Sequence, residues 1–325
     1  MKTLTFAPAL VGAVAFSGVA AAQVAVFATN PQGSLGYRTG IAVAKTVTAK
    51  ADGITGRPQP MGGSTTYIPI VNRGEVGFGF SNGMETLYAY KGTGTFKGRA
   101  QPNLRMIGRM FPLRTGIATV ADFGARSIHD LKKLKGKRIT SKYTSLSIIE
   151  TFIEGALANG NANYSMFKQV PVSGFAKGIF ALGEGKTDIS WISLGSGAGR
   201  KVNTQLRGRG GFVYLDMDVS PAAKARFSKI MPAAKIVLEK NTKMPGITKP
   251  THIVEIDYVL FTHKGMDNET AYKVTKALAT NKAHLAKSMG AFNRLNPATF
   301  AEPNMAPYHP GALKAIKELG LKMGS

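Results

Sequence analysis

Apolar and polar positions alternate along this chain in two different patterns. Short apolar runs predict buried strands, and longer stretches with apolar residues three or four positions apart predict helices. The predicted strands span residues 24–29, 53–60, 75–80, 103–110, 115–121, 187–193 and 253–262. The predicted helices span residues 36–49, 64–72, 145–159, 173–183, 221–231, 268–289 and 311–319. Because the two kinds of element alternate, the pattern predicts an α/β fold with mostly parallel sheets.

Two segments of the chain resemble each other. Residues 71–80 and 182–192 each end a helix, turn at a glycine (Gly74 and Gly185) and enter a strand. One such unit in each half is what a two-lobed binding protein would show. Helix–glycine–strand joints are common in α/β folds generally, so the repeat alone does not identify the class.

The segment 127–141 joins a short helix to a strand. Ser127 is a typical N-cap, two leucines share one face, and Gly136 is a typical helix stop. An extended stretch at 138–140 then leads into a loop rich in Ser and Thr. The segment resembles the one that opens the second lobe of bilobal periplasmic solute-binding proteins. That resemblance implies a protein that captures a solute rather than transforming it.

The first 22 residues are typical of a secretory signal peptide. Lys2 supplies a positive start, an apolar run spans 6–19, and alanines at 20–22 favour cleavage after Ala22. A membrane anchor is the alternative, but the run is short and contains Pro8. No later stretch is long and apolar enough to cross a bilayer. We therefore expect an exported protein that does not span the membrane.

The chain is strongly basic and has no cysteine. Its 42 Lys and Arg residues against 18 Asp and Glu give a formal net charge of +24, which favours an anionic partner: an anionic solute, an acidic membrane surface or a polyanion. The cations are scattered rather than clustered with aromatic residues, so no nucleic acid is expected as a partner. Without cysteine there is no thiol nucleophile and no thiolate ligand, and the five histidines lack metal-ligand spacing. We expect no metal and no cofactor.

Two glycine-containing loops lie between a predicted strand and a predicted helix. The first contains Gly33, Ser34 and Tyr37, and the second contains Gly63 and Ser64. Glycine lets the backbone approach a ligand, and the start of a helix offers free N–H groups to an anion. Each loop by itself could be only a tight turn. Two of them at successive strand ends favour a carboxylate-binding cradle.

Several further segments, in this order, resemble the TAXI family of TRAP-transporter solute receptors. They are residues 33–37, 61–64, 73–78, 96–98 with 103–105, and 307–312. The resemblance runs almost from end to end of the mature chain. It implies a bilobal periplasmic-binding-protein fold (type II-like), in which hinge strands join two α/β lobes around a ligand cleft. Lobe one would hold residues 23–112 and about 258–325, and lobe two about 113–257.

The same resemblance implies a function. The protein would be a periplasmic receptor and not an enzyme. It would close its lobes on a small anionic organic solute, a carboxylate or an amino acid, and deliver that solute to TRAP membrane subunits.

The resemblance also implies ligand-binding residues in both lobes. Tyr37 and Tyr143 would cover the apolar part of the solute, and Arg38 or Arg114 would supply a countercharge. The loop at 140–145 departs from the family pattern because it has no glycine, so the identity of the ligand does not carry over. The expected binding residues are Gly33, Ser34, Tyr37, Gly63, Ser64, Ser81, Asn82, Tyr143, Thr144, Ser145 and Ser193.

One motif supports an alternative function. Residues 79–83 fit the pattern G-x-S-x-G, in which Ser81 would be the nucleophile of a secreted serine hydrolase. Asp257 and either His263 or His309 would have to complete the triad. No oxyanion-hole segment of the HGGG type precedes the serine, which weakens this interpretation. Trp191 is open to two roles, a core residue or a surface for ligand stacking.

Overall fold

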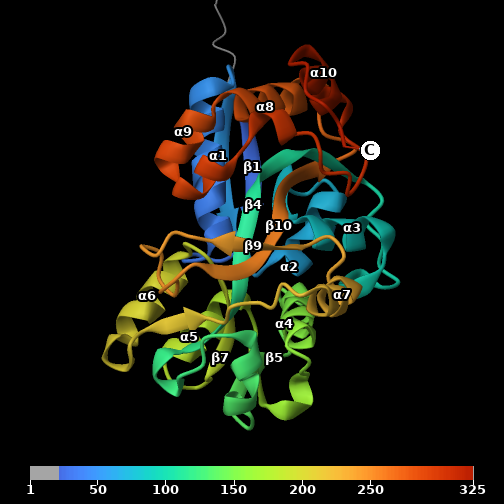
Figure 1. Cartoon of the computed structure of the whole chain (residues 1–325). Coiled ribbons are helices and arrows are strands. Elements are labelled where there is room, and N and C mark those ends of the chain that lie inside the picture. Colours follow the sequence, from blue (N-terminus) through green and yellow to red (C-terminus); the bar gives the residue numbers. More distant parts are fainter. Residues whose placement is uncertain (1–21, 325) are drawn as a thin grey trace, which may run out of the picture.

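The computed structural model describes residues 22–324, so residues 1–21 of the predicted signal peptide lie outside the described part of the chain. Figure 1 shows how the elements are arranged. The strands are β1 Gln23–Thr29, β2 Ile54–Pro60, β3 Phe78–Asn82, β4 Leu104–Val120, β5 Arg138–Ser141, β6 Lys168–Pro171, β7 Ile189–Ser193, β8 Phe212–Tyr214, β9 Lys235–Glu239 and β10 Thr251–His263. The α-helices are α1 Leu35–Lys50, α2 Ser64–Asn72, α3 Gly83–Lys91, α4 Ile148–Asn159, α5 Phe175–Gly183, α6 Gly197–Gln205, α7 Pro221–Ile230, α8 Asn268–Thr280, α9 Lys282–Ser288 and α10 Pro310–Glu318.

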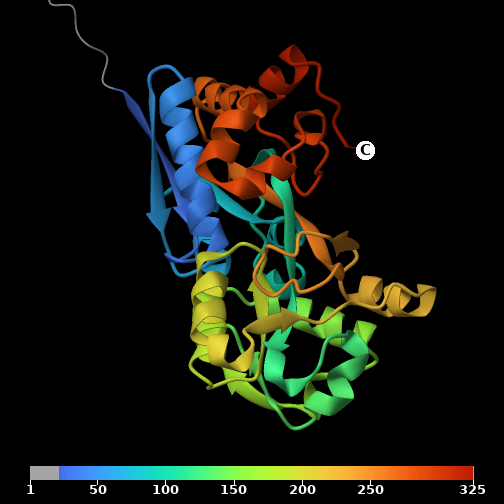
Figure 2. The ribbon, with the colours of Figure 1, turned by 60° about the vertical axis from the view of Figure 1, so that its left-hand side comes forward.

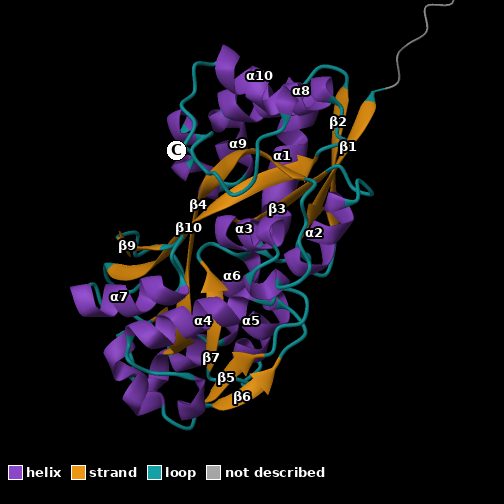
Figure 3. Cartoon of the chain, turned by 90° about the vertical axis from the view of Figure 1, so that its right-hand side faces the viewer, coloured by secondary structure: helices purple, strands orange, loops and turns teal. Residues whose placement is uncertain are grey.

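The strands of the described chain join one sheet that contains the same unit twice. Its order is β2-β1-β3-β10-β4-β7-β5-β6, with β8 paired to β4 and β9 to β10. In the first lobe β2, β1 and β3 are parallel neighbours, and in the second lobe β6, β5 and β7 repeat that order. Figure 3 shows these two groups of strands on either side of the crossing of β4 and β10. The expected bilobal α/β class is confirmed.

The two predicted glycine joints occupy equivalent places in the two units. Gly74 follows the C-cap of α2 and Gly185 the C-cap of α5, with φ angles of 79° and 68°. In both joints the glycine N–H donates to the carbonyl three residues earlier. A positive φ favours glycine, so the same chemistry ends the helix and redirects the chain in both lobes.

Two long antiparallel strands connect the lobes and correct the expectation of mostly parallel sheets. The chain leaves the first lobe along β4 and returns along β10, so the two connections run in opposite directions. The strands predicted at 103–110 and 115–121 are one continuous strand, β4. The stretch between them contains Pro112, which lies beside a shift in the β4–β10 register, where a missing N–H is tolerated.

Helices cover the outer faces of the sheet in both lobes. In the first lobe α1 packs on β2 and against α8 and α9, while α10 packs on α8 (Figures 1 and 2). In the second lobe α4 packs against α7, and α5 against α6. None of the described helices is both long and apolar enough to span a membrane.

Several elements differ from the sequence prediction in detail. The short helix capped by Ser127 is a 3-10 helix, Ile128–Leu134. The helix predicted at 268–289 is broken into α8 and α9 at Asn281, whose side chain donates to the carbonyl of Ala277. Such a bond competes with the helical backbone bond. The strand β6 was not predicted because its four side chains are partly or fully exposed and give little apolar signal, and the strand β9, whose apolar run of three residues is short, was missed as well.

Candidate functional site

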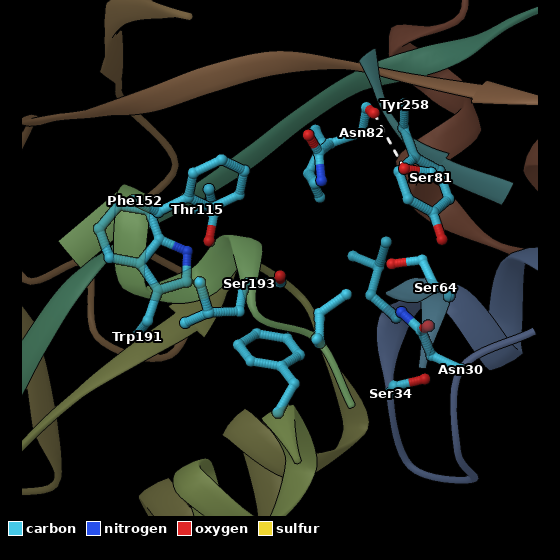
Figure 4. Close-up of a pocket in the computed structure, with 16 residues that line it drawn as sticks. Asn30, Ser34, Ser64, Ser81, Asn82, Thr115, Phe152, Trp191, Ser193 and Tyr258 are labelled. Carbon is cyan, nitrogen blue, oxygen red and sulfur yellow. Dashed lines mark hydrogen bonds between the residues drawn. The ribbon is translucent and has the colours of Figure 1, made fainter. Parts of the chain in front are cut away.

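A small cavity lies between the two lobes, where the carboxyl ends of their parallel strands face each other. Open α/β sheets bind ligands beyond this edge. The cavity has a volume of about 40 Å³, enough for a few water molecules or one compact group of a solute. Every residue that lines it is buried, so the lobes enclose it. Figure 4 shows its lining.

The first-lobe wall of the cavity is polar. Ser34 caps α1 and accepts the N–H of Tyr37, Ser64 is the first residue of α2, and Asn82 caps α3. The first N–H groups of a helix have no intrahelical partner and carry positive potential. Three helix starts therefore face the cavity. The polar residues of this wall are Asn30, Ser34, Ser64, Ser81 and Asn82.

The second-lobe wall is apolar. Residues of α4, the start of α5 and β7 form it, and the rings of Phe152 and Trp191 pack with their centroids 5.7 Å apart. In Figure 4 the indole nitrogen of Trp191 faces the cavity, next to Ser193. The apolar residues of this wall are Leu146, Ile149, Phe152, Phe175 and Trp191. The cavity therefore suits a solute with a polar head and an apolar body.

A buried carboxylate, Glu85, lies directly behind the polar wall. Its Oε2 accepts from Ser64 Oγ at 2.5 Å, from Ser81 Oγ at 3.1 Å and from Asn82 Nδ2 at 3.3 Å, and its Oε1 accepts from Thr65 Oγ1 at 3.1 Å. Burial raises the pKa of Glu85, and these hydroxyl donors oppose that rise. The hydroxyl hydrogens of Ser64 and Ser81 are engaged with acceptors of the protein, so their lone pairs remain for a donor in the cavity.

Tyr258 contributes a buried hydroxyl to the cavity. Its ring stacks between Phe80 and Phe111, at centroid distances of 6.2 and 5.4 Å. The hydroxyl has no hydrogen-bond partner within the described chain, although a buried hydroxyl normally has one. Burial, with a further contribution from Glu85, raises the pKa of Tyr258, so the group stays neutral and can donate. A Cβ at Gly36 would come within 2.7 Å of the hydroxyl oxygen, so only glycine leaves room for it.

The lobes touch each other along a seam beside the cavity. The N–H of Ala198 donates to the carbonyl of Gly33 at 3.0 Å, and the N–H of Ser147 donates to Thr65 Oγ1 at 3.2 Å. A side chain at Gly63 would overlap the carbonyl oxygen of Ser145. The two lobes are therefore in contact beside the cavity, and we call this arrangement the closed form.

The expected binding residues divide into three groups. Ser34, Ser64, Ser81, Asn82 and Ser193 line the cavity, while Gly33, Gly63 and Ser145 lie at the seam. The other three, Tyr37, Tyr143 and Thr144, do not line it.

Tyr143 requires a correction, because it does not cover the cavity. It is 2% exposed, and its hydroxyl donates to Thr140 Oγ1 within the second lobe. Thr144 is exposed and donates to the carbonyl of Ser173, and Tyr37 is half-buried on the first turn of α1. Trp191, Phe152, Phe175 and Tyr258 supply the aromatic cover instead.

Neither Arg38 nor Arg114 lines the cavity, which corrects the expectation that one of them supplies a countercharge to the solute. Arg114 forms ion pairs with Glu239 at 2.8 Å and Glu255 at 3.0 Å, and Arg38 donates to the carbonyl of Gly195 at 3.1 Å. No Lys, Arg or His is among the residues described as lining the cavity. Positive potential there comes from helix starts rather than from cations.

Sequence reasoning missed several residues of this site, among them Glu85 and Tyr258. Asn82 and Glu85 fit a capping box, in which the glutamate side chain would return to the backbone at the cap. Asn82 does cap α3, with Oδ1 accepting the N–H of Glu85, but the carboxylate turns to the serines of the cavity instead. Tyr258 sits inside a long strand, and no local pattern distinguishes it from a core residue.

The structure does not assemble a triad around Ser81. Its Oγ lies 3.0 Å from the carbonyl oxygen of Asn82 and 3.1 Å from Glu85 Oε2. Asp257 pairs with Arg109, and His309 caps α10 by accepting the N–H of Gly311. In the described part of the chain, no group of three or more His, Asp or Glu side chains is placed to hold a metal ion.

Comparison with known proteins identifies the family of this chain. A model of the NMT1-like family matches residues 27–320. The chain belongs to the NMT1-like family. A comparison of this NMT1-like protein with curated proteins finds no match.

Solved structures share the fold of this NMT1-like protein. PhnD1 from Prochlorococcus marinus, in complex with methylphosphonate, is 13% identical, with a TM-score of 0.55 over 92% of this chain and 98% of that one. A periplasmic transporter is 12% identical, with a TM-score of 0.57 over 92% and 93%. A binding protein component of an ABC phosphonate transporter from Pseudomonas aeruginosa is 9% identical, with a TM-score of 0.51 over 83% and 78%. The shared feature is the bilobal fold of periplasmic solute-binding proteins.

Proposed function

We propose that this NMT1-like protein is the periplasmic solute-binding receptor of a TRAP-type transporter of the TAXI class, and that it is not an enzyme. The observation that carries the proposal is the enclosed cavity at the seam of two lobes, polar on one wall and apolar on the other. Lobe closure on a solute would bury it there and create the surface that the TRAP membrane subunits recognise. Ser81 lacks a histidine partner, which disfavours the hydrolase alternative.

The solute we propose is a small organic acid, bound through its carboxylate. Free N–H groups at the starts of α1 and α2 and the Tyr258 hydroxyl would donate to that carboxylate. The lone pairs of Ser64 and Ser81 would accept from a second group on the solute, such as an amino or hydroxyl group. The solute is therefore anionic or zwitterionic, and an amino acid or a hydroxy acid satisfies both sets of groups.

The hinge of this closure would lie where β4 and β10 cross between the lobes. We place the boundaries near residues 112–113 and 257–258, so that lobe two spans about 113–257. Ion pairs between Arg109 and Asp257, and between Arg114 and Glu255, join the two strands at this place. They would keep the strands in register while each lobe turns as a body.

A thermal-shift screen of the mature protein tests the proposal. The panel holds dicarboxylates, hydroxy acids, oxo-acids and amino acids, each with its amide or ester as a matched neutral control. A solute at 100 times its dissociation constant should add about 2.7 kcal/mol of stability. We expect a shift with at least one acid and none with its neutral control. A panel without any shift would contradict the carboxylate proposal.

A covalent probe tests the alternative. A fluorophosphonate reacts with the activated serine of a hydrolase. We expect no labelling of the wild-type protein. Labelling that Ser81→Ala abolishes would establish the hydrolase and overturn the receptor.

A further inference from the structure

Two arginines from opposite lobes meet at the seam. Arg38 belongs to the first turn of α1 in the first lobe, and Arg200 belongs to α6 in the second lobe. Both donate from Nη1 to the same acceptor, the carbonyl oxygen of Gly195, at 3.1 and 2.8 Å. The two nitrogens are therefore no more than about 6 Å apart, a distance at which like charges repel appreciably.

No carboxylate balances this pair in the described part of the chain. Ion pairs elsewhere in the molecule engage many arginines, including Arg109, Arg114 and Arg138, but neither Arg38 nor Arg200 has one. The first turns of α1 and α6 contain no acidic residue either. Burial and the neighbouring Arg200 both lower the pKa of Arg38, as expected for a cation without an anionic partner.

We propose that Arg38 and Arg200 form a site for a small oxyanion that bridges the closed lobes. Each guanidinium uses one of its five N–H donors on Gly195, and the other N–H groups match the spaced oxygens of sulfate, phosphate or a carboxylate. The site is separate from the solute cavity, because neither arginine is among the residues that line it. It exists as a pair only in the closed form, since each lobe brings one arginine.

The bridging geometry makes the anion a regulator of closure. Without the anion, repulsion between the two cations opposes closure. With the anion, the same two charges hold the lobes together. An anion that binds the closed form more tightly than the open form favours closure. By reciprocity, it must also increase the affinity for the solute, which binds the closed form as well. This consequence rests on the proposed function, whereas binding of the anion itself does not.

Sulfate at low millimolar concentration is the probe, compared with chloride at the same ionic strength. Sulfate should raise the melting temperature of the solute-free wild-type protein in a saturable way. Arg38→Gln and Arg200→Gln should abolish that increase. Lys201→Gln is the matched control, because it removes the next cation of α6, which lies over the Phe180 ring, and should keep the response. A response that persists in Arg200→Gln, or that is lost equally in Lys201→Gln, would overturn the site.

Solute affinity is a second measurement that tests the site, because loss of Arg200 should not weaken solute binding when sulfate is absent. Arg200 bonds within its own lobe, so Arg200→Gln leaves the bond between Arg38 and Gly195 intact. In a buffer without sulfate, Arg200→Gln should bind the solute at least as tightly as wild type. Saturating sulfate should improve the wild-type affinity about fivefold or more and leave the variant unchanged. Weaker binding by Arg200→Gln without sulfate would contradict the proposal. If no solute is found, the sulfate titration of the solute-free protein still decides whether the anion site exists.

Discussion

At the scale of single residues, Glu85 decides what the polar wall of the cavity offers. Its carboxylate accepts hydrogen bonds from Ser64, Ser81 and Asn82. The two serine hydroxyls therefore face the cavity as hydrogen-bond acceptors, whereas without Glu85 they could donate to a solute. Burial is the largest cause of the raised pKa of Glu85, and the hydroxyl donors around it offset only part of that rise. The group therefore affects both the chemistry of the cavity and the pH dependence of the fold.

The stability of the protein should depend on pH through Glu85. Between the ordinary carboxyl pKa and its raised value, the folded protein keeps a proton that the unfolded chain has released. The free energy of unfolding is then highest below the ordinary pKa and falls as pH rises through the raised value, by about 1.4 kcal/mol for each pH unit between the two. Urea unfolding from about pH 4 to about pH 8 measures this fall. Glu85→Gln should flatten this part of the curve, and parallel curves for the two proteins would contradict the role of Glu85.

Tyr258→Phe should separate solute binding from stability. The ring keeps its stacking on Phe80 and Phe111, and only a hydroxyl without a protein partner is lost. Solute affinity should fall by about 0.5–1.5 kcal/mol, while the solute-free protein should be as stable as wild type or more so. Tyr308→Phe is the control, because its hydroxyl donates to the carbonyl of Pro303 at 2.9 Å. That variant should lose stability and keep its affinity, and the reverse pattern would exclude Tyr258 from the site.

At the scale of elements, local chemistry was sufficient to predict the repeated units. The helix starts at Ser34 and Ser64 and the glycine joints at Gly74 and Gly185 depend on neighbours within a few residues, so the sequence shows them directly. Pairing between distant strands has no such local signal. The antiparallel crossing of β4 and β10 was missed for that reason.

The start of α2 gives a test of the seam. Gly63 precedes this helix with an extended backbone, φ 165°, which any residue can adopt. The nearest atoms to a side chain there all belong to Ser145 of the other lobe. Gly63→Ala should therefore leave the solute-free stability unchanged and weaken solute binding by about 1–3 kcal/mol, the cost of a steric clash, which is about 5- to 150-fold. Gly208→Ala is the control, since no atom lies near its added Cβ. Unchanged affinity in Gly63→Ala would show that solute binds without this closure.

At the scale of the whole molecule, the net charge of +24 is carried by side chains that do not line the cavity. The crossing strands neutralise Arg109 and Arg114 with acids, and the seam holds the pair of Arg38 and Arg200. An enclosed solute is shielded from added ions, so its affinity should change little between low and physiological concentrations of a monovalent chloride salt. The sequence predicted a preference for anions from composition, but composition could not show that helix starts, rather than cations, face the cavity.

Small-angle scattering of the mature protein, with and without the solute that raises its melting temperature, tests lobe closure most directly. Closing two lobes about a hinge shortens the molecule. We predict that saturating solute lowers the radius of gyration of the wild-type protein, and that Gly63→Ala needs a correspondingly higher solute concentration for the same decrease. A wild-type radius of gyration that stays the same with bound solute would contradict capture by closure of the lobes.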